Sequence, residues 1–308
     1  MNSKLLEYFL RVAELGSINK AAVDLRISQP ALSRNVSLLE HEMGTELFHR
    51  SRGGVSLTEP GKMLYENARP LLRHFTTLKE QVGELAKGNV AIGLPPSWRN
   101  IVSVRIAELL ITEFPDIKVR INEAVSHSLR DQLADGSLDL CVAPADSNVS
   151  DAFRQTRLVS DPMVLVGGPD SGLKDTGIVS LSELDGLPMI IPSRPNVMRA
   201  KIEHELALLG LDLKVVIETD TLNLCMDLAA RGDGYTVVPR CALLSLETAR
   251  TPHWARISDL EIVWSLFENT RRSHSHAVRH CRREIRKIVQ EKLAEGDWAG
   301  ATPLKQQN

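Results

Sequence analysis

The sequence predicts two regions of different fold class joined by one long helix. Residues 1–58 are expected to form short helices and a hairpin, an all-α winged helix-turn-helix domain, and residues 59–88 a linker helix. From residue 89, strand and helix patterns alternate in two successive series, which predicts a C-terminal α/β domain of two subdomains. A chain of 308 residues, 43% of them hydrophobic, is long enough to fill several such cores.

The first forty residues carry the spacing of a helix-turn-helix. Three short helices are expected, at residues 5–15, 19–25 and 29 to about 40. Residues 26–28 leave room only for a tight turn between the second and third helices. Ser28 is a favourable N-cap, and Pro30 falls in the first turn of the third helix, where its missing N–H is tolerated.

The third helix divides into an apolar arc and a polar arc. The apolar arc, which should pack inward, consists of Ala31, Leu32, Val36 and Leu39. The polar arc, which is left free, consists of Gln29, Pro30, Ser33, Arg34 and Ser37. Amide, guanidinium and hydroxyl groups near a helix N-terminus can reach base edges and phosphates in a major groove of DNA. The polar arc is therefore a candidate DNA-reading face, although a solvated helix surface would show the same pattern.

The segment LFHRSRGGVSLT, residues 47–58, predicts a hairpin that follows the third helix. Arg50 and Arg52 stand just before its glycine turn and could contact the DNA backbone or the minor groove, or could be ordinary hairpin charges. The formal net charge of −2 gives no general attraction to a polyanion, so any contact with DNA must be local. The acids of this region, Glu40 among them, are expected to lie away from the basic face.

The linker helix carries one apolar seam. Its members recur in steps of four and three: Leu64, Ala68, Leu71, Phe75, Leu78, Val82 and Leu85. Thr58 can cap its start and Gly88 suits its end. Packing on the core of its own domain is one interpretation, but a long helix between two domains has little core of its own. Pairing with the same helix of a second chain is therefore favoured.

The C-terminal region, residues 89–295, is expected to contain two series of strands and helices. The first series comprises VAIGLPP, a helix at 102–114, IKVRINEA, a short helix to Gly136, and LDLCVAP; the second comprises LPMIIP, a helix at 197–209, LKVVIET, a helix at 222–231, and YTVVP. The segments 162–167 and 262–267 are candidates for two crossing strands, and a last helix at 275–293 should return to the first subdomain. Subdomain 1 is then expected at about 89–162 and 268–295, subdomain 2 at about 163–267, and a frayed tail at 296–308.

Residues 9–68 resemble the N-terminal domain of LysR-type transcriptional regulators. The resemblance lies in GS, AA, SQPALS, LE and LF, followed by the wing and the LT entry to the linker, and it continues more weakly to about residue 294 through GLPPS, PSRPN and GYTVVP. It implies a homodimer or homotetramer assembled through linker helices, with RNA polymerase as a further partner. It also implies two Rossmann-like subdomains, as in periplasmic binding proteins, that hold a small inducer and alter transcription. The positions that match the family's DNA contacts are Gln29, Pro30, Ser33, Arg34, Arg50 and Arg52.

An effector site is expected at the carboxyl ends of strands, where helix N-termini present free N–H groups. The residues at such ends, which match inducer-contacting positions of the resembled family, are Ser97, Ser193, Arg194, Asn196 and Thr221. Ser193 and Thr221 could instead be simple N-caps. Hydroxyl groups, an amide and helix dipoles together favour a small anion, and we expect an organic carboxylate as effector.

The other chemistry-bearing residues favour no second site. Cys141, Cys225, Cys241 and Cys281 are scattered, so buried reduced thiols are expected, with a redox-responsive Cys225 and Cys241 as the alternative. His276 and His280, one helical turn apart and followed by Cys281, could bind a metal, but a solvated basic helix face is favoured.

The sequence contains no glycine-rich phosphate loop, nucleophile elbow or paired-histidine metal motif, so neither an enzyme nor a cofactor is expected. The first residues lack an uninterrupted signal-peptide core and no run is apolar enough to span a bilayer, which predicts a cytoplasmic protein without membrane contact. The competing functions are a cytoplasmic small-molecule binding protein and an enzyme that has acquired a DNA-binding domain.

Overall fold

The computed structural model describes residues 3–51, 54–82, 88–147, 149–150, 152–245, 251–270 and 275–304. The chain divides into two units: the N-terminal unit runs to Glu84 and also includes Asp135–Ser137, and the C-terminal unit comprises the rest of the chain from Leu85. Within the described ranges, none of the helices has an apolar stretch long enough to cross a membrane.

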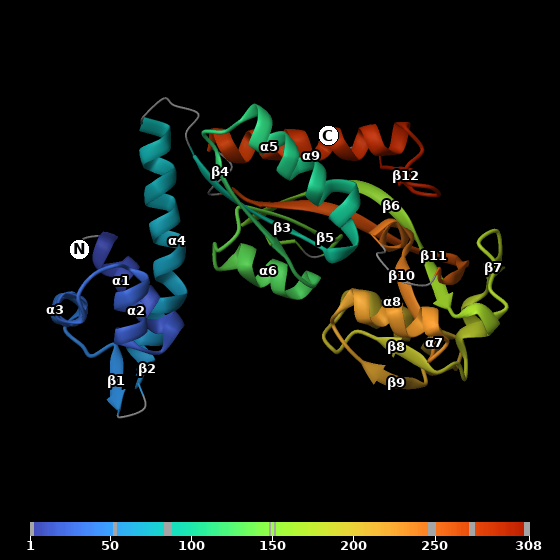
Figure 1. Ribbon diagram of the computed structural model, residues 1–308, viewed down its shortest axis with the longest axis horizontal. Helices are drawn as coiled ribbons and strands as arrows, with labels where there is room; N and C mark the ends of the chain where they lie inside the picture. The colour runs from blue at the N-terminus through green and yellow to red at the C-terminus, as the bar shows by residue number, and fades with distance from the viewer. Residues whose placement is uncertain are drawn as a thin grey trace. The chain divides into compact units, whose positions relative to one another are not determined.

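The N-terminal unit is a helical domain with one hairpin (Figure 1). Its elements are α1 (Ser3–Leu15), α2 (Ile18–Asp24), α3 (Gln29–Met43), β1 (Phe48–Ser51), β2 (Gly54–Leu57) and α4 (Glu59–Val82). Phe9 of α1 and the α3 residues Leu32, Val36 and Leu39 are fully buried, and the rings of Phe9 and Phe48 lie 5.1 Å apart. The helix-turn-helix and the hairpin are thus as expected, and the inward arc of α3 fills the core.

The hairpin is held against the turn between α1 and α2. The N–H of Val55 donates to the carbonyl of Gly16 at 3.0 Å. Gly54 has a φ of +134°, and a Cβ at this position would lie 2.5 Å from the Gly16 carbonyl oxygen. Glycine is therefore required here both by the backbone conformation and by the close approach.

Two predicted helix caps differ in their geometry. The Thr58 hydroxyl accepts from the N–H of Gly61 at 3.0 Å and donates to the Glu46 carbonyl at 2.7 Å, so Thr58 caps α4 as expected. Ser28 occupies the N-cap position of α3, but its side chain makes no capping hydrogen bond. The N-terminal N–H groups of α3 are therefore not satisfied by this hydroxyl.

The apolar seam of α4 needs a correction at its start. Ala68 is fully buried and Leu64 is half-buried against the core of the same N-terminal unit, so these two residues pack within their own chain. Leu71 is 53% exposed and remains a candidate for contact with a second chain. Phe75, Leu78 and Val82 lie outside the described side chains, and Leu85 lies outside the described residues.

Subdomain 1 of the C-terminal unit has helices on both faces of a sheet (Figure 1). Its elements are β3 (Asn89–Leu94), β4 (Lys118–Glu123), β5 (Leu140–Pro144), α5 (Val104–Glu113), α6 (Ser126–Ala134) and α9 (His276–Ala294). β3 runs parallel to both β4 and β5. Ile92 and Leu94 pack on the α5 and α9 side, whereas Ala91 packs on the α6 side with Leu129. A parallel strand covered on both faces is apolar at nearly every position, as β3 is.

Subdomain 2 repeats the pattern on a smaller scale. Its elements are β7 (Ile178–Val179), β8 (Met189–Ile191), β9 (Val215–Glu218), β10 (Thr236–Pro239), α7 (Val197–Leu208) and α8 (Leu222–Arg231). β8 pairs in parallel with β9, and an isolated bridge from Met189 to Tyr235 joins β8 to the start of β10.

Two long antiparallel strands run through both subdomains. They are β6 (Phe153–Gly167) and β11 (His253–Asn269), and both extend well beyond the six-residue segments that the sequence suggests. Their register shifts between Arg256 and Glu261, which marks an irregularity where they pass from one subdomain to the other. The crossing arrangement is as expected from the sequence.

The expected frayed tail is wrong for the described residues 296–304. β12 (Thr302–Pro303) pairs with Ser160 and Val159 of β6, and Trp298 is 2% exposed. The Trp298 ring lies 5.2 Å from that of Trp98 in an edge-on arrangement. Burying a large aromatic side chain offsets the entropy of ordering the short segment that carries it.

Candidate DNA-binding face and ligand cleft

The free face of α3 gathers the predicted recognition residues on one exposed surface. Gln29, Pro30 and Arg34 are exposed and Ser33 is half-buried, on the side opposite the fully buried arc. Within the described part of the chain, Arg34 forms neither an ion pair nor a hydrogen bond, so its five N–H donors face solvent. This surface can present a guanidinium, an amide and hydroxyl groups to another molecule.

The hairpin arginine Arg50 is held by α3. Its Nη2 donates to the Ser37 hydroxyl and to Glu40 Oε2, each at 3.3 Å. Glu40 Oε1 in turn accepts from the N–H groups of Leu47 and Phe48 at 3.0 and 3.2 Å. The expectation that Glu40 lies away from the basic face is therefore wrong, because its side chain turns toward the hairpin. Arg50 borders the α3 face, but part of its charge is offset.

Arg52, the second hairpin arginine of the prediction, lies outside the described residues.

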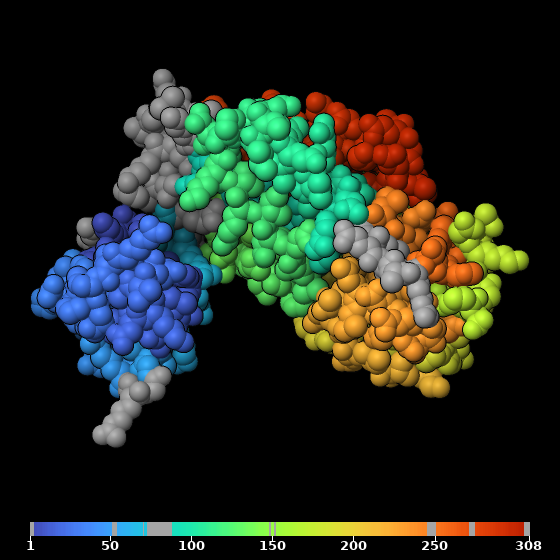
Figure 2. Space-filling view, viewed as in Figure 1, coloured from blue at the N-terminus to red at the C-terminus, as the bar shows by residue number. Residues whose placement is uncertain are grey.

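A small cavity lies where the two subdomains meet. Subdomain 1 contributes Ser97 and Ser126, and subdomain 2 contributes Asn196, Asp220 and Thr236, among mainly apolar neighbours. In Figure 2 the green atoms of subdomain 1 lie against the orange atoms of subdomain 2. Its volume is about 60 Å³. Since one water occupies roughly 10–15 Å³ on this scale, the cavity suits a ligand of only a few non-hydrogen atoms.

The structure brings two of the five predicted effector residues to this cavity. Ser97 lies in the 3₁₀ turn Pro96–Trp98 after β3 and is 5% exposed. Asn196 is the N-cap of α7, where its Oδ1 accepts from the N–H groups of Met198 and Arg199. Both side chains line the cavity, although the oxygen of Asn196 is already engaged as a cap.

The other three predicted effector residues do not line the cavity. The N–H of Ser193 donates to Asp220 Oδ1 at 3.0 Å, and the exposed Arg194 pairs with Glu203 at 2.9 Å. Thr221 is exposed at the N-cap position of α8 and makes no capping hydrogen bond with its side chain. Neither Ser193 nor Thr221 is thus a side-chain N-cap, and the alternative interpretation fails as well.

Sequence reasoning missed several residues of the cavity. Ser126 opens α6 beyond the end of β4, and this is the same signal that selected Ser97, so it could have been found. Thr236 lies inside the buried strand β10, where its hydroxyl is indistinguishable by sequence from a packed core residue. Its side chain is 1% exposed, and no nitrogen or oxygen of the described residues satisfies its Oγ1; its polar neighbour is the thiol of Cys225, a weak hydrogen-bonding group.

The orphaned hydroxyl and the helix starts give the cavity its polar character. An unsatisfied buried hydroxyl costs about 1–3 kcal/mol, which a hydrogen-bonding ligand or water would recover. Helices α6 and α8 begin at the cavity, and helix N-termini attract negative charge. The residues that line it include no lysine or arginine and one carboxylate, Asp220. Any anion bound there would be held by dipoles and hydroxyl groups and not by a counter-charge.

A buried carboxyl stands behind the cavity wall. Asp161 of β6 is fully buried, and its Oδ2 accepts from Trp264 Nε1 at 3.3 Å and from the N–H of Cys241 at 3.4 Å. Burial raises the pKa of Asp161 above its ordinary value. Trp264 itself lines the cavity and packs edge-on against Trp98 at 5.7 Å. The carboxyl thus fixes the ring that forms one wall of the cleft.

Replacing Asp161 with asparagine should change how the thermal midpoint depends on pH. Because the pKa is raised in the folded state, the native protein binds more protons than the unfolded chain above about pH 4, and stability falls as pH rises through the folded pKa. Each unit of raised pKa is worth about 1.4 kcal/mol. Asp161→Asn lacks this contribution, so its midpoint relative to the wild type should rise between pH 4 and 8. A difference in midpoint that does not vary with pH would contradict the assignment.

The cysteines provide no support for redox control. All four are free and buried. Burial raises the pKa of Cys225 to about 11 and that of Cys141 to about 12, and it raises the pKa of Cys241 as well. The thiolate is the reactive form, and these thiols stay protonated at neutral pH. The alternative of a redox pair at Cys225 and Cys241 is not favoured.

The possible metal ligands in the last helix, His276, His280 and Cys281, are not arranged as a metal site. The His280 ring lies 3.8 Å from that of Phe114 in a tilted arrangement, and its Nδ1 lies 2.9 Å from Arg283 Nη2, while Cys281 is buried in the core. Over the described ranges, no three histidine, cysteine or acidic side chains come together as metal ligands.

Two family models match the chain. Residues 3–62 match "Bacterial regulatory helix-turn-helix protein, lysR family", and residues 83–290 match "LysR substrate binding domain". The curated relatives include the nitrogen assimilation regulatory protein nac of Klebsiella aerogenes, 32% identical over 87% of this chain and 88% of the relative. They also include the DNA-binding transcriptional dual regulator OxyR of Escherichia coli, 31% identical over 79% of this chain and 80% of the relative.

Solved structures share the fold over nearly the whole chain. A full-length OxyR variant from Pseudomonas aeruginosa has a TM-score of 0.69 at 19% identity, covering 94% of this chain and 95% of the other. Full-length CbnR in complex with its target DNA has a TM-score of 0.67 at 17% identity, covering 94% of this chain and all of the other.

Proposed function

This chain belongs to the LysR family of transcriptional regulators, and from that premise we propose that the free face of α3 reads operator DNA under the control of a small molecule in the cleft. The observation that supports this proposal is that α3 has two different sides. Its inner arc is fully buried, while Gln29, Ser33 and Arg34 face outward. We assign base or phosphate contacts to these residues and to Pro30. We assign backbone or minor-groove contacts to Arg50 and Arg52.

Binding of the full-length protein to the duplex upstream of its own gene tests this assignment. The affinity for that duplex and for a scrambled duplex is measured across a salt series. A preference that persists as salt rises indicates base recognition, because backbone contacts alone weaken equally on both sequences. Equal, weak binding to both duplexes would mean that this upstream region is not the operator or that α3 does not read sequence.

We propose a small organic carboxylate as the effector. Three features support this choice: the uncapped start of α8, the hydroxyl groups of Ser97 and Thr236, and the small volume of the cavity. We further propose that Ser97, Asn196 and Thr236 contact the effector directly. Ser193, Arg194 and Thr221 would act only if the cleft rearranges around its ligand.

Thr236→Val separates ligand recognition from packing. The substitution removes the orphaned hydroxyl at nearly constant volume, so the ligand-free protein should be as stable as the wild type or slightly more stable. Affinity for a carboxylate should fall by about 1 kcal/mol, or roughly fivefold. Thermal midpoints with a panel of small carboxylates and their neutral amides provide the readout, with the exposed Thr112→Val as control.

The carboxylate proposal fails if neutral or cationic metabolites raise the midpoint and no carboxylate does. The role of Thr236 fails if its valine variant binds a confirmed ligand as tightly as the wild type.

The remaining partners are proposed from the family and from α4. We propose a cytoplasmic homodimer or homotetramer in which the exposed part of the α4 seam, beginning at Leu71, pairs with the same helix of a second chain. RNA polymerase is the protein partner proposed for transcriptional control. The domain limits proposed for these roles are residues 1–58, 59–88 and 89–295.

A further inference from the structure

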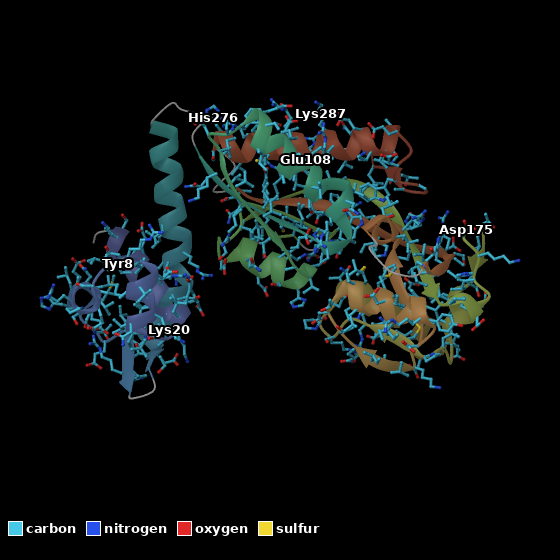
Figure 3. All side chains as sticks on the ribbon, viewed as in Figure 1. Tyr8, Lys20, Glu108, Asp175, His276 and Lys287 are labelled. Atoms are coloured by element: carbon cyan, nitrogen blue, oxygen red, sulfur yellow. The ribbon has the colours of Figure 1, made fainter. Side chains whose placement is uncertain are left out.

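Positive charge gathers on the outer side of the last helix, α9. An open, shallow furrow lies between side chains of this one helix and is lined by Arg279, Arg282, Arg283, Arg286 and Lys287, which we call the α9 basic face. His276 and His280 lie at one end of the furrow. Figure 3 labels His276 and Lys287, which lie along the same helix. Because the formal net charge of the whole chain is −2, this concentration of positive charge on α9 is a local feature.

The orientation of α9 is fixed by its opposite side. Val278, Ile285 and Ile288 are at most 2% exposed in the core of the C-terminal unit. The helix cannot rotate about its axis without exposing these side chains, and burial of each is worth about 1.5–3 kcal/mol. The basic face is therefore held outward by the packing.

The acids near α9 offset only part of its charge. Arg282 pairs with the buried Glu268 at 2.9 Å, and Arg283 pairs with the buried Glu284 at 2.9 Å. Lys287 lies 3.6 Å from Glu291.

The remaining two arginines, Arg279 and Arg286, form no ion pair within the residues that the structure describes. They stand seven positions apart, which places them on the same side of the helix about 10 Å from each other along its axis. The guanidinium groups of Arg279 and Arg286, on the same side of α9, are thus left for an anionic partner.

We propose that the α9 basic face binds the phosphate backbone of DNA, as a sequence-independent contact separate from the α3 face. The furrow is lined by cationic and polar side chains only, whereas protein interfaces have apolar or aromatic anchors at their centre. From Arg279 to Gln290 the helix rises about 16 Å, which is long enough to contact more than one phosphate of a DNA backbone. The proposal takes DNA as the partner of this regulator but does not depend on which residues of α3 read it.

The test compares charge-removing pairs in the full-length protein. Arg279→Gln with Arg286→Gln removes the two unpaired arginines, and Lys174→Gln with Lys214→Gln removes two exposed cations of subdomain 2. Affinity is measured against salt concentration on the duplex upstream of the protein's own gene and on a random-sequence duplex of equal length. Both duplexes extend well beyond one operator so that flanking backbone is available.

The arginine pair should lower the slope of log affinity against log salt by about 2 for each subunit whose α9 basic face contacts the duplex, since each phosphate contact contributes about 0.9. At low salt the affinity should fall about fivefold to tenfold on both duplexes equally, because backbone contacts ignore sequence. The lysine control should change neither quantity. Replacement of the same two arginines by lysine should restore most of the slope, since lysine still binds phosphate as a point charge.

An unchanged slope and affinity in the arginine pair, relative to the lysine control, overturns the proposal. Unchanged DNA binding with reduced transcription in a purified system also overturns it, in favour of an anionic protein partner. Failure of the α3 assignment has a different signature, because it removes the preference for the upstream duplex while the slope on the random duplex still reports the α9 contact.

Discussion

Arg34→Ala should lower the affinity of the full-length protein for its operator by about 1–3 kcal/mol, the usual value of a bidentate contact to a base. The guanidinium of Arg34 is exposed on the free face of α3 and has no partner within the described residues, so nothing in the free protein competes for it. The same residue lies close to the helix N-terminus, where recognition helices approach the bases. The loss should be measured as a ratio of dissociation constants at matched salt.

The control for Arg34→Ala is Arg105→Ala. The Arg105 side chain is 54% exposed on α5 of the C-terminal unit and lies 3.8 Å from Glu108. It removes the same charge and the same number of atoms, so it reports the effect of net charge on DNA binding. If Arg34→Ala binds the operator as tightly as Arg105→Ala does, Arg34 is a solvated surface residue.

Arg34→Ala also separates two kinds of contact. A lost base contact reduces the preference for operator over scrambled duplex, whereas a lost phosphate contact weakens both and lowers the salt slope by about 1. The expected result is the first, because the polar arc of α3 and not a loop presents the side chain.

Residues whose role depends on helix periodicity could be predicted from the sequence. The arcs of α3 follow from 3.6 residues per turn, and the structure buries Leu32, Val36 and Leu39 completely on the expected side. The alternation of strands and helices also fixes the order of elements, since parallel strands need a crossover between them. The periodicity and spacing of residues in the sequence are sufficient to predict a feature that depends on one helix or strand alone.

Residues whose role depends on contacts between distant segments could not be predicted in this way. Glu40 was expected away from Arg50, yet the hairpin folds back on α3 and joins the two at 3.3 Å. The sequence predicts a frayed tail around Trp298, because the contacts that order it, with Trp98 and through the pairing of β12 with β6, come from distant parts of the chain.

The cavity shows the same limit. The strand-end rule points to Ser97, which lines the cavity, but the buried hydroxyl of Thr236 becomes visible only when neighbouring side chains fail to satisfy it. Hydrogen-bond satisfaction is a property of the folded surroundings, and the sequence does not contain those distances.

Trp264→Ala should destabilise the C-terminal unit by about 3–5 kcal/mol, the usual cost of removing a large buried aromatic side chain. Trp264 is 1% exposed, packs on Trp98 and donates to Asp161, so its loss leaves a void and removes one of the two N–H donors of Asp161 Oδ2, the other being the N–H of Cys241. The free energy of unfolding in denaturant measures the effect. Trp254→Ala provides a control, because the half-buried Trp254 contacts Arg240 outside the cavity wall.

Trp264→Phe divides this effect into its parts. Phenylalanine retains most of the packing against Trp98 but cannot donate to Asp161, whose Oδ2 keeps the N–H of Cys241, so it should cost about 0.5–1.5 kcal/mol, the net value of one hydrogen bond. Asp161→Ala, which removes the acceptor, combined with Trp264→Phe, which removes the donor, should then cost less than the sum of the two single changes, since both remove the same hydrogen bond. Strict additivity would show that the indole and the carboxyl act independently. If this hydrogen bond fixes the cavity wall, the effects of the two substitutions on stability must be coupled. The same bond then sets both the position of Trp264 beside the ligand and the stability of the crossing strands.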